Sequence, residues 1–386
     1  MDAVEPSPHD PAKAYIAVLR YQLGDPKPFI YKTENYGKSW KLLTDGKNGI
    51  PLDYPTRVVR EDPVRQGLLF AGTEYGVFVS MDDGGSWKSF QQNLPVTPIT
   101  DMKIHRGDVV LSTMGRAFWI LDNISPLRQT DLEGGQPQLL KPQDAVRFRM
   151  PSGSWGSHMP EYPEPGVHLD YILPEASDQP LKLEIRNAEG QVLTAYSSDT
   201  IPSPESEVVR DMGTNFTEFL VTESLTNQKG LNRFRWDMSH AGPWNKSDTR
   251  RYRNGPMAKP GTYTAVLTVG KVSSSQTFEL KIDPRVLEAG VSEQDIDAQV
   301  ALQLKVRDKV SETLQMQDKI EKEIETLEAE KRTQTQEARL ELLKETLSKI
   351  KTEEGIYMQP MLADQWRYLY FMLNQADQLP GKDAVD

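Results

Sequence analysis

The sequence predicts a mainly β protein that combines a partial β-propeller of two to three blades, an immunoglobulin/fibronectin-like sandwich and a C-terminal α-helical hairpin. Three observations support this prediction. A strand, turn and strand pattern recurs after 47 residues, a period that suits one four-stranded propeller blade. Short strand-like runs then fill residues 137–285, and the apolar residues after position 292 follow helical spacing.

The clearest single pattern is SMDDGGSW at residues 80–87, directly after the apolar run GVFV. Its main positions are Ser80, Asp82, Gly84 and Trp87. We expect the carboxylate of Asp82 to accept hydrogen bonds from N–H groups of a turn, and Gly84 to adopt a positive φ. Trp87 is expected to fold back over the turn. The pattern therefore predicts a structural turn between two strands.

The same layout occurs earlier in the chain, with Thr in place of Ser and Asn in place of Asp. Its positions are Thr33, Asn35, Gly37 and Trp40. A third, eroded copy at residues 111–123 aligns without gaps on residues 71–83, which places Phe118 on Phe78. Residues 1–130 are thus expected to form the C-terminal blades of a propeller.

An open array of two to three blades exposes sheet edges, which closure normally removes. We therefore expect N-terminal blades before Met1 in the full-length protein, and assembly of blades between chains is the alternative. Residues 137–285 are expected to form the sandwich, because six or seven short strands fit that architecture. Residues 288–386 are expected to form the helical hairpin or coiled-coil tail, since Ser292 and Asp295 form a variant capping box before the first apolar stripe.

Composition limits the classes of function. The formal net charge of −11 disfavours nonspecific binding to nucleic acid or an anionic membrane. The absence of cysteine excludes disulfides, thiolate zinc sites and cysteine nucleophiles, and the five histidines are scattered, so we expect no metal and no cofactor. The sequence has neither a run of about 18 apolar residues that could span a membrane nor a signal peptide at Met1.

Several phrases resemble one family of proteins: REDP at residues 60–63, GLLFAGTE at 67–74, GRAFWILD at 115–122 and QADQLPGKDA at 375–384. Together with the turn pattern, which resembles the Asp-box of the bacterial neuraminidase (BNR) repeat, they are similar to large exported bacterial proteins labelled glycosyl hydrolases, whose propeller is related to that of sortilin. The resemblance implies a propeller, a sandwich-like module and a helical tail, in a periplasmic or extracellular protein. The chain departs from the family at Met114, where histidine is usual, and at Asn35.

No catalytic set is visible, so whether the protein is an enzyme stays open. Glycosidases use two carboxylates about 5 to 10 Å apart. The acids that we nominate, Glu61, Asp62, Glu74 and Asp101, have no identifiable partner in the sequence. We expect each of them to be a solvated turn carboxylate, and Asp82 to have a structural hydrogen-bonding role.

Exposed aromatic and charged residues in loops are the candidates for binding a ligand, because aromatic rings stack on sugars and anchor protein interfaces. They are Glu74, Arg116, Trp155, His158, Tyr162, Trp244 and Tyr252. The alternative for the loops of the second β region is that they pack against the propeller or cover sheet edges, and the alternative for Arg116 is a salt bridge between blades. We expect a binding or scaffold region for a carbohydrate, protein or peptide ligand. A glycoside hydrolase whose carboxylates lie mainly on N-terminal blades and a sortilin-like peptide receptor are the alternatives.

Overall fold

The computed structural model describes residues 3–129, 135–149, 165–199, 209–210, 217–220, 224–246, 250–252, 255–329, 333–353 and 359–385. The chain forms two compact units, Met1–Glu133 and Gly134–Asp386. Each unit is described by itself. The division into propeller, sandwich and helical domains stays a prediction, because the second unit contains both sheets and helices.

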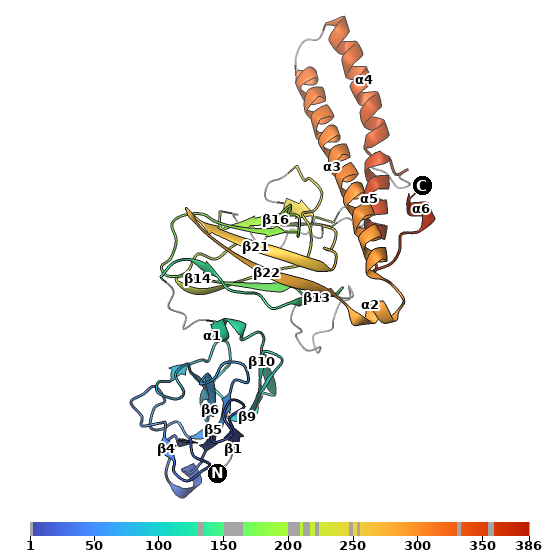
Figure 1. The fold of residues 1–386 in the computed structure, drawn as a ribbon. Helices are drawn as coiled ribbons and strands as arrows, with labels where there is room; N and C mark the ends of the chain where they lie inside the picture. The colour runs from blue at the N-terminus through green and yellow to red at the C-terminus, as the bar shows by residue number, and fades with distance from the viewer. Residues whose placement is uncertain are drawn as a thin grey trace. The chain divides into compact units, whose positions relative to one another are not determined.

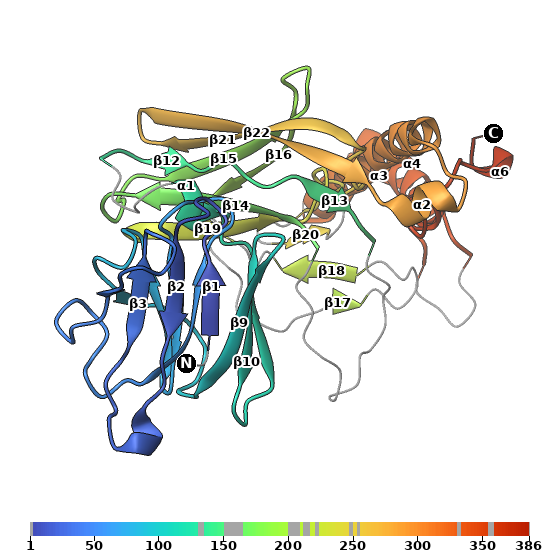
Figure 2. The same ribbon diagram turned by 60° about the horizontal axis from the view of Figure 1, so that its bottom comes forward.

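The first unit consists of three antiparallel sheets that follow one another along the chain (Figures 1 and 2). The first has the order β1 (Ala3–Pro6), β2 (Ala14–Ala17), β3 (Ile30–Thr33) and β4 (Lys41–Leu42). The second has the order β5 (Thr56–Glu61), β6 (Leu69–Thr73), β7 (Gly76–Ser80) and β8 (Lys88–Ser89). The third contains β9 (Ile99–His105), β10 (Asp108–Thr113) and β11 (Phe118–Leu121), with β10 in the middle. A short 3₁₀ helix, Tyr21–Leu23, and helix α1 (Ser125–Gln129) lie in connections.

The second sheet is buried on both faces. One core cluster joins it to the first sheet and includes Ala71 and Phe78, and another joins it to the third sheet and includes Phe70 and Val79. All residues of β6 and β7 are buried. Because successive side chains of a strand point to opposite faces, a strand covered on both sides must be apolar throughout, as these two nearly are.

The gapless alignment of the third sheet on the second is wrong by one residue after the hairpin. Ala71 pairs with Phe78, whereas its counterpart Leu111 pairs with Trp119. The hairpin before β11 is one residue longer, and Ala117 at its end has a φ of +58°. A shift of one residue sends a side chain to the opposite face. Phe118 therefore points away from the core and is 77% exposed.

Two sheets of the second unit enclose one large apolar core. The smaller has the order β12 (Gln138–Leu139), β14 (Val167–Leu173) and β19 (Gly230–Trp236). The larger has the order β13 (Ala145–Arg147), β22 (Val272–Ile282), β21 (Gly261–Val269), β15 (Leu181–Arg186) and β16 (Val192–Ser197). A further small sheet contains β17 (Val209–Arg210), β18 (Thr217–Leu220) and β20 (Arg250–Tyr252).

Alternation along β21 explains why one face of the larger sheet is buried. Tyr263, Ala265 and Leu267 face the core, and the residues between them do not. The ring of Tyr263 lies 5.5 Å from that of Trp236, a residue of the opposite sheet that is fully buried. Aromatic contacts of this kind add to the burial of apolar area and hold the two sheets together.

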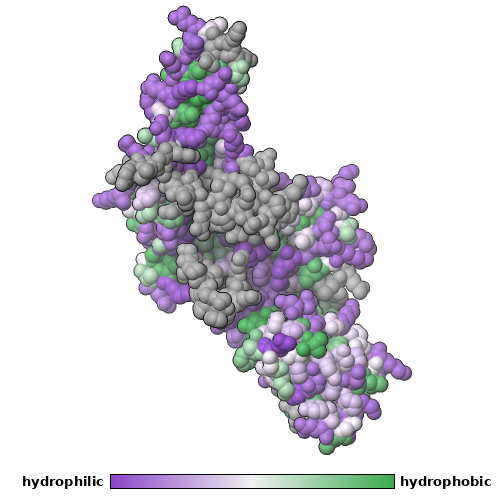
Figure 3. Space-filling view, turned by 180° about the vertical axis from the view of Figure 1, so that it is seen from behind, coloured by the Kyte–Doolittle hydropathy of each residue, from purple (hydrophilic) through white to green (hydrophobic). Residues whose placement is uncertain are grey.

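The C-terminal region is helical and contains α2 (Pro284–Glu288), α3 (Glu293–Ala329), α4 (Gln334–Ile350), α5 (Leu362–Leu373) and α6 (Lys382–Val385). Helices α3 and α4 run alongside each other (Figure 1). The hydroxyl of Ser292 accepts from Asp295 N–H and the carboxylate of Asp295 accepts from Ser292 N–H, which begins α3 as the capping pattern predicts. Apolar residues such as Ile320 and Leu343 pack between the helices, whose surface in Figure 3 is mostly hydrophilic.

The prediction of a mainly β chain with a C-terminal helical region is confirmed. Within the described ranges, no helix is both long and apolar enough to cross a membrane.

Candidate functional site

The turn at Ser80 is built by side-chain hydrogen bonds to the backbone. The hydroxyl of Ser80 accepts from Gly84 N–H (2.9 Å), and the carboxylate of Asp82 accepts from Ser86 N–H (2.8 Å) and from the Ser86 hydroxyl (2.7 Å). Gly84 has a φ of +83°, which favours glycine. Although partial burial raises the pKa of Asp82, the hydrogen bonds from Ser86 and Ser80 outweigh it and hold the pKa below its usual value.

The turn at Thr33 has the same geometry. The hydroxyl of Thr33 accepts from Gly37 N–H (2.9 Å), and the amide oxygen of Asn35 accepts from Ser39 N–H (2.9 Å). The amide of Asn35 also donates to the Ser39 hydroxyl (2.8 Å). Asn can replace Asp here because the hydroxyl of serine acts as donor or acceptor. Both turns therefore use their polar side chains to hold the backbone.

The two tryptophans of these turns differ in environment. Trp87 is 3% exposed, whereas Trp40 is 42% exposed and lies over its own turn beside Gly37. The indole of Trp87 donates to the main-chain oxygen of Leu43 in the first sheet (3.3 Å). Trp40 has no preceding sheet among the described residues against which to pack, so the same pattern gives a buried and an exposed side chain.

Asp83, which the sequence analysis did not single out, joins the second turn to the first sheet. Its carboxylate accepts from the hydroxyl of Tyr15 and forms ion pairs with Lys13 (2.9 Å) and Lys32 (2.9 Å). Burial raises the pKa of Asp83, but these three donors outweigh it and lower the pKa. Burial and the neighbouring carboxylates raise the pKa of Tyr15. The partners are 51 to 70 residues away from Asp83 in sequence. Only the stacking of the repeated sheets could have predicted these contacts.

Two of the nominated acids, Glu61 and Asp62, are buried in structural interactions, so the expectation that they are solvated turn carboxylates is wrong. One oxygen of Glu61 accepts from Gly67 N–H (2.9 Å) and from the Tyr15 hydroxyl (3.3 Å), and its other oxygen has no hydrogen-bond partner within the described ranges. Asp62 accepts from two backbone N–H groups of the following turn and forms a salt bridge with Arg128 (2.7 Å). Neither carboxylate is open to a substrate, because both side chains are fully buried.

Arg60 connects the first strands of all three sheets. From β5 it reaches Glu5 on β1 (3.2 Å) and Asp101 on β9 (2.7 Å), and it donates to the main-chain oxygen of Met102 (2.7 Å). Burial raises the pKa of Glu5, against the opposing charge of Arg60. Glu5 and Asp101 therefore share one guanidinium, which links the first strands of the three sheets.

Glu74 and Arg116 lie near hairpin ends of the first unit. The carboxylate of Glu74 forms an ion pair with Arg57. Arg116 is exposed, its N–H donates to the hydroxyl of Thr113 (3.1 Å) and its oxygen accepts from Trp119 (2.9 Å). Its guanidinium has no partner in the part of the chain that the structure describes, so it is available to a negatively charged group.

The loop candidates of the second unit are not gathered at one described site. Trp155, His158 and Tyr162 lie outside the described residues, and only the backbone of Tyr252 is described, in β20. Trp244 is partly buried against the apolar cluster between α3 and α5, and its main-chain N–H donates to the Ser311 hydroxyl (3.0 Å). Trp244 therefore packs against helices, and not against the propeller or a sheet edge, which were the alternatives that the sequence analysis named for such loops.

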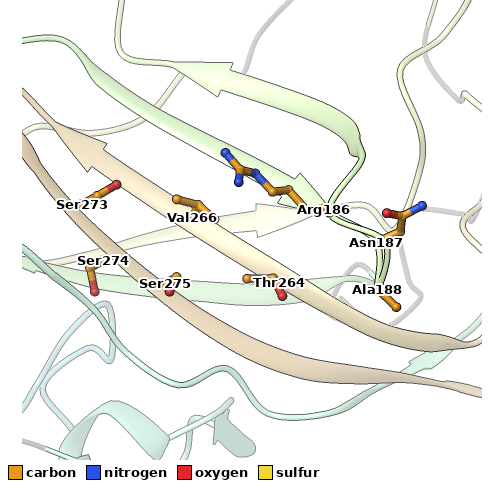
Figure 4. A pocket seen from close by; sticks show the side chains of 9 residues that line it. Arg186, Asn187, Ala188, Thr264, Val266, Ser273, Ser274 and Ser275 are labelled. Carbon is orange, nitrogen blue, oxygen red and sulfur yellow. The ribbon is translucent and has the colours of Figure 1, made fainter.

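A shallow hollow of about 360 Å³ lies on the outer face of the larger sheet. Figure 4 shows Arg186, Thr264 and Val266 with a row of serines, Ser273 to Ser275, along its lining. The guanidinium of Arg186 is already paired with Glu184. The hollow is polar and hydroxyl-rich, and none of its residues was predicted from the sequence, because serine and threonine are ordinary on the outer face of a strand.

A buried ionic cluster links β13 to the segment after α5. Asp377 forms ion pairs with Arg147, which is 1% exposed, and with Arg149 (2.6 Å). Arg147 also donates to the main-chain oxygen of Ala258 (2.9 Å). Burial raises the pKa of Asp377, but the two arginines outweigh it and lower the pKa. Asp377 lies in the QADQLPGKDA phrase. The sequence analysis therefore singled out this segment, but it did not predict the ion pairs of Asp377 with Arg147 and Arg149.

The ranges that the structure describes contain no group of three or more His, Cys, Asp or Glu side chains that could hold a metal ion. The geometry of the first unit instead supports two functions of its polar residues: closing turns and joining neighbouring sheets.

No protein-family model matches the sequence, and no curated protein matches it. Among solved structures, the GH74 enzyme from Niastella koreensis is similar at a TM-score of 0.26 and 10% identity, over 71% of this chain and 46% of that one. An ancestral GH74 enzyme is similar at a TM-score of 0.24 and 13% identity, over 68% of this chain and 37% of that one. The chain thus spans less than half the length of either enzyme.

Proposed function

We propose that the chain is a binding and scaffold region of an exported multidomain protein, and that its first unit contributes two to three Asp-box blades to a β-propeller. The second sheet supports this proposal because it is apolar and buried on both faces. The outer sheets leave apolar residues uncovered: Val4 and Leu42 on the first, and Phe118 and Ile120 on the third. Further sheets of the same kind would bury them.

The uncovered residues of the first sheet form a continuous row. Val4 pairs with Ile16, Ile16 with Tyr31, and Tyr31 with Leu42. Residues that are paired across strands share one face, so the row crosses all four strands. Tyr31 corresponds to Phe78 of the second sheet, which is buried against the first sheet. A preceding blade would cover this row in the same way.

One observation favours a scaffold role over a catalytic role: each nominated acid already forms an ion pair or accepts hydrogen bonds within the protein. Asp62 is paired with Arg128, Glu74 with Arg57 and Asp101 with Arg60. Glu61 is buried and accepts hydrogen bonds from its own sheet and from the first sheet. A glycosidase needs one carboxyl group that donates a proton and a second that attacks or activates water, both open to the substrate. A structural role accounts for all four acids.

Within the second unit, we propose an immunoglobulin/fibronectin-like sandwich followed by a helical hairpin as separate modules. The shared core between the two larger sheets supports the sandwich. The ligand is a carbohydrate or a protein, and Arg116 is its contact on the first unit because its guanidinium is exposed on a hairpin.

Binding and turnover are measured separately to test the function. The chain is screened against a panel of glycans and exported peptides, and variants Arg116→Ala and Arg106→Ala are compared. Arg106 is the matched control, since it is also exposed on a hairpin of the third sheet. We expect Arg116→Ala alone to weaken binding. In parallel, aryl glycosides are assayed with the chain. Robust turnover that a single carboxylate substitution abolishes would overturn the scaffold proposal in favour of a glycoside hydrolase, and saturable binding confined to peptides would favour the sortilin-like receptor.

A further inference from the structure

Among the described residues, the third sheet lacks a strand that the first two sheets possess. After β3 and β7 the chain returns as β4 and β8 and pairs with the strand that it has just left. In the first sheet Leu43 N–H donates to Ile30 O (2.8 Å), and in the second Phe90 N–H donates to Val77 O (2.8 Å). After β11 the chain instead forms α1, and β11 is the terminal strand of its sheet.

The register identifies which residues of β11 would bind a fourth strand. Gly72 pairs with Val77, and its counterpart Ser112 pairs with Phe118. Thr113 N–H donates to Ala117 O (3.2 Å) toward the inside of the sheet. Because hydrogen-bonding direction alternates along an antiparallel strand, the backbone groups of Phe118 and Ile120 point to the outer edge.

This edge is open in the described structure. The backbone N–H and C=O groups of Phe118 and Ile120 have no partner within the described ranges. Their side chains are 77% and 58% exposed. Natural edge strands are normally protected by charge, proline, bulges or a covering segment. An apolar edge with free backbone groups is a template for another strand.

The first two sheets show which strand fits. Residues 39–43 read SWKLL and residues 86–90 read SWKSF, so both fourth strands have Ser-Trp-Lys, one further residue and then Leu or Phe. In the second sheet Lys88 pairs with Val79, and the ring of Phe90 packs 6.2 Å from that of Phe70. The residues that follow β11 have no such pattern.

We propose that the outer edge of β11 is a docking site for a partner polypeptide, which binds as an extended strand with the pattern Ser-Trp-Lys-x-Leu/Phe. The strand pairs antiparallel with β11, and its Leu or Phe packs beside Phe118, as Phe90 lies beside Val77. Backbone hydrogen bonds provide the affinity, and the side-chain pattern selects the partner. The proposal rests on the equivalence of the three sheets and not on the ligand proposed above, so either can fail alone.

The probe is a labelled synthetic peptide with the sequence of residues 84–91, GGSWKSFQ, titrated against the whole chain by fluorescence anisotropy. We expect saturable binding, and we expect the peptide to slow hydrogen exchange at the amides of Phe118 and Ile120. A peptide with Ala in place of its Trp and a scrambled peptide are the controls. Equal binding of all three peptides, or no binding of any, would overturn the proposal.

Two variants locate the site. Ile120→Lys places a charge on the open edge and is expected to weaken peptide binding about tenfold. Val4→Lys is the matched control, because Val4 is also an exposed apolar strand residue but lies on the first sheet, and it should bind the peptide as the wild type does. Circular dichroism checks that both variants are folded. If Ile120→Lys unfolds the chain, the proposal is tested by hydrogen exchange of the wild type. Peptide that does not slow exchange at the amides of Phe118 and Ile120 would overturn it.

A second copy of the chain is the other occupant that an open edge can attract. Sedimentation of the wild type without peptide distinguishes the two. A monomer whose β11 amides become protected only when peptide is added supports the proposal. A dimer whose β11 amides are protected in the absence of peptide would overturn it, since β11 would then pair with itself.

Discussion

The indole N–H of Trp87 donates to the main-chain oxygen of Leu43, 3.3 Å away, and so joins the second turn to the first sheet. Trp40 has the same place in its own turn, 47 residues earlier, but no sheet in the described part of the chain covers it, and it is 42% exposed. The position of each sheet in the array, and not the local pattern, therefore decides how much a turn tryptophan stabilises the protein.

This difference predicts unequal effects of substitution. We expect Trp87→Ala to lower the free energy of unfolding by about 3 to 5 kcal/mol, because it removes a large buried side chain and leaves a cavity. Trp40→Ala is the control and should cost below about 1 kcal/mol, as exposed positions usually do. Urea unfolding followed by circular dichroism measures both. Equal losses would contradict the proposed importance of the neighbouring sheet.

Asp82 provides a second prediction. Asp82→Ala removes the acceptor for Ser86 N–H and for the Ser86 hydroxyl, and we expect a loss of about 1 kcal/mol because the site is exposed. Asp82→Asn should lose less than half of this, since Asn35 makes the equivalent bonds in the first turn. Thermal unfolding of the two variants provides the comparison. An equal loss for Asn and Ala would show that the negative charge, which both variants remove, matters, and not the hydrogen bonds that only Asn can restore.

Local sequence patterns predicted the secondary structure of this protein, but they did not predict its long-range contacts. The mainly β character and the C-terminal helices follow from residue spacing, which reports the face on which each side chain lies. The partners of Asp83 could not be read from the sequence, because Lys13 and Lys32 reach it only when two sheets stack. The role of Arg60, which joins three separate strands, was hidden for the same reason.

The position of Phe118 shows a second limit. Its alignment with Phe78 ignored one extra hairpin residue, and that residue moves the side chain from the core to the surface. Among the candidate binding residues, Trp244 contacts the helical cluster, which composition alone could not reveal. Loop residues have no periodicity that would separate packing from binding.

The buried side chain of His240 leads us to expect that stability depends on pH between about pH 4 and pH 6.5. Burial, together with the positive charge of Arg307, lowers the pKa of His240 from 6.5 to about 4. The unfolded chain therefore binds a proton at His240 between these pH values and the folded chain does not, so stability is complete above pH 6.5 and falls as the pH approaches 4. The contribution is of the order of 2 to 3 kcal/mol. His240→Gln should flatten the dependence, measured as urea midpoints of the second unit across this window, whereas His105→Gln, a substitution in the first unit, should leave these midpoints unchanged.

The buried pair of Asp377 and Arg147 leads to another large predicted loss of stability. Asp377→Asn leaves Arg147 buried with an uncompensated charge, which typically costs about 3 to 5 kcal/mol. Asp144→Asn is the matched control, because Asp144 pairs with Lys281 at 2.8 Å but both side chains are exposed, and it should cost below about 1 kcal/mol.

The same pair also predicts sensitivity to acid. The pKa of Asp377 lies below its usual 3.8 in the folded chain, so the unfolded chain takes up this proton first as the pH falls. The stabilisation is complete above pH 3.8 and is lost as the pH falls through the lower pKa of the folded state. Urea midpoints of the second unit at neutral and acid pH should therefore fall more steeply for the wild type than for Asp377→Asn. If the variant loses as much stability in acid as the wild type does, other carboxylates must account for the acid sensitivity, and the assigned role of Asp377 would be wrong.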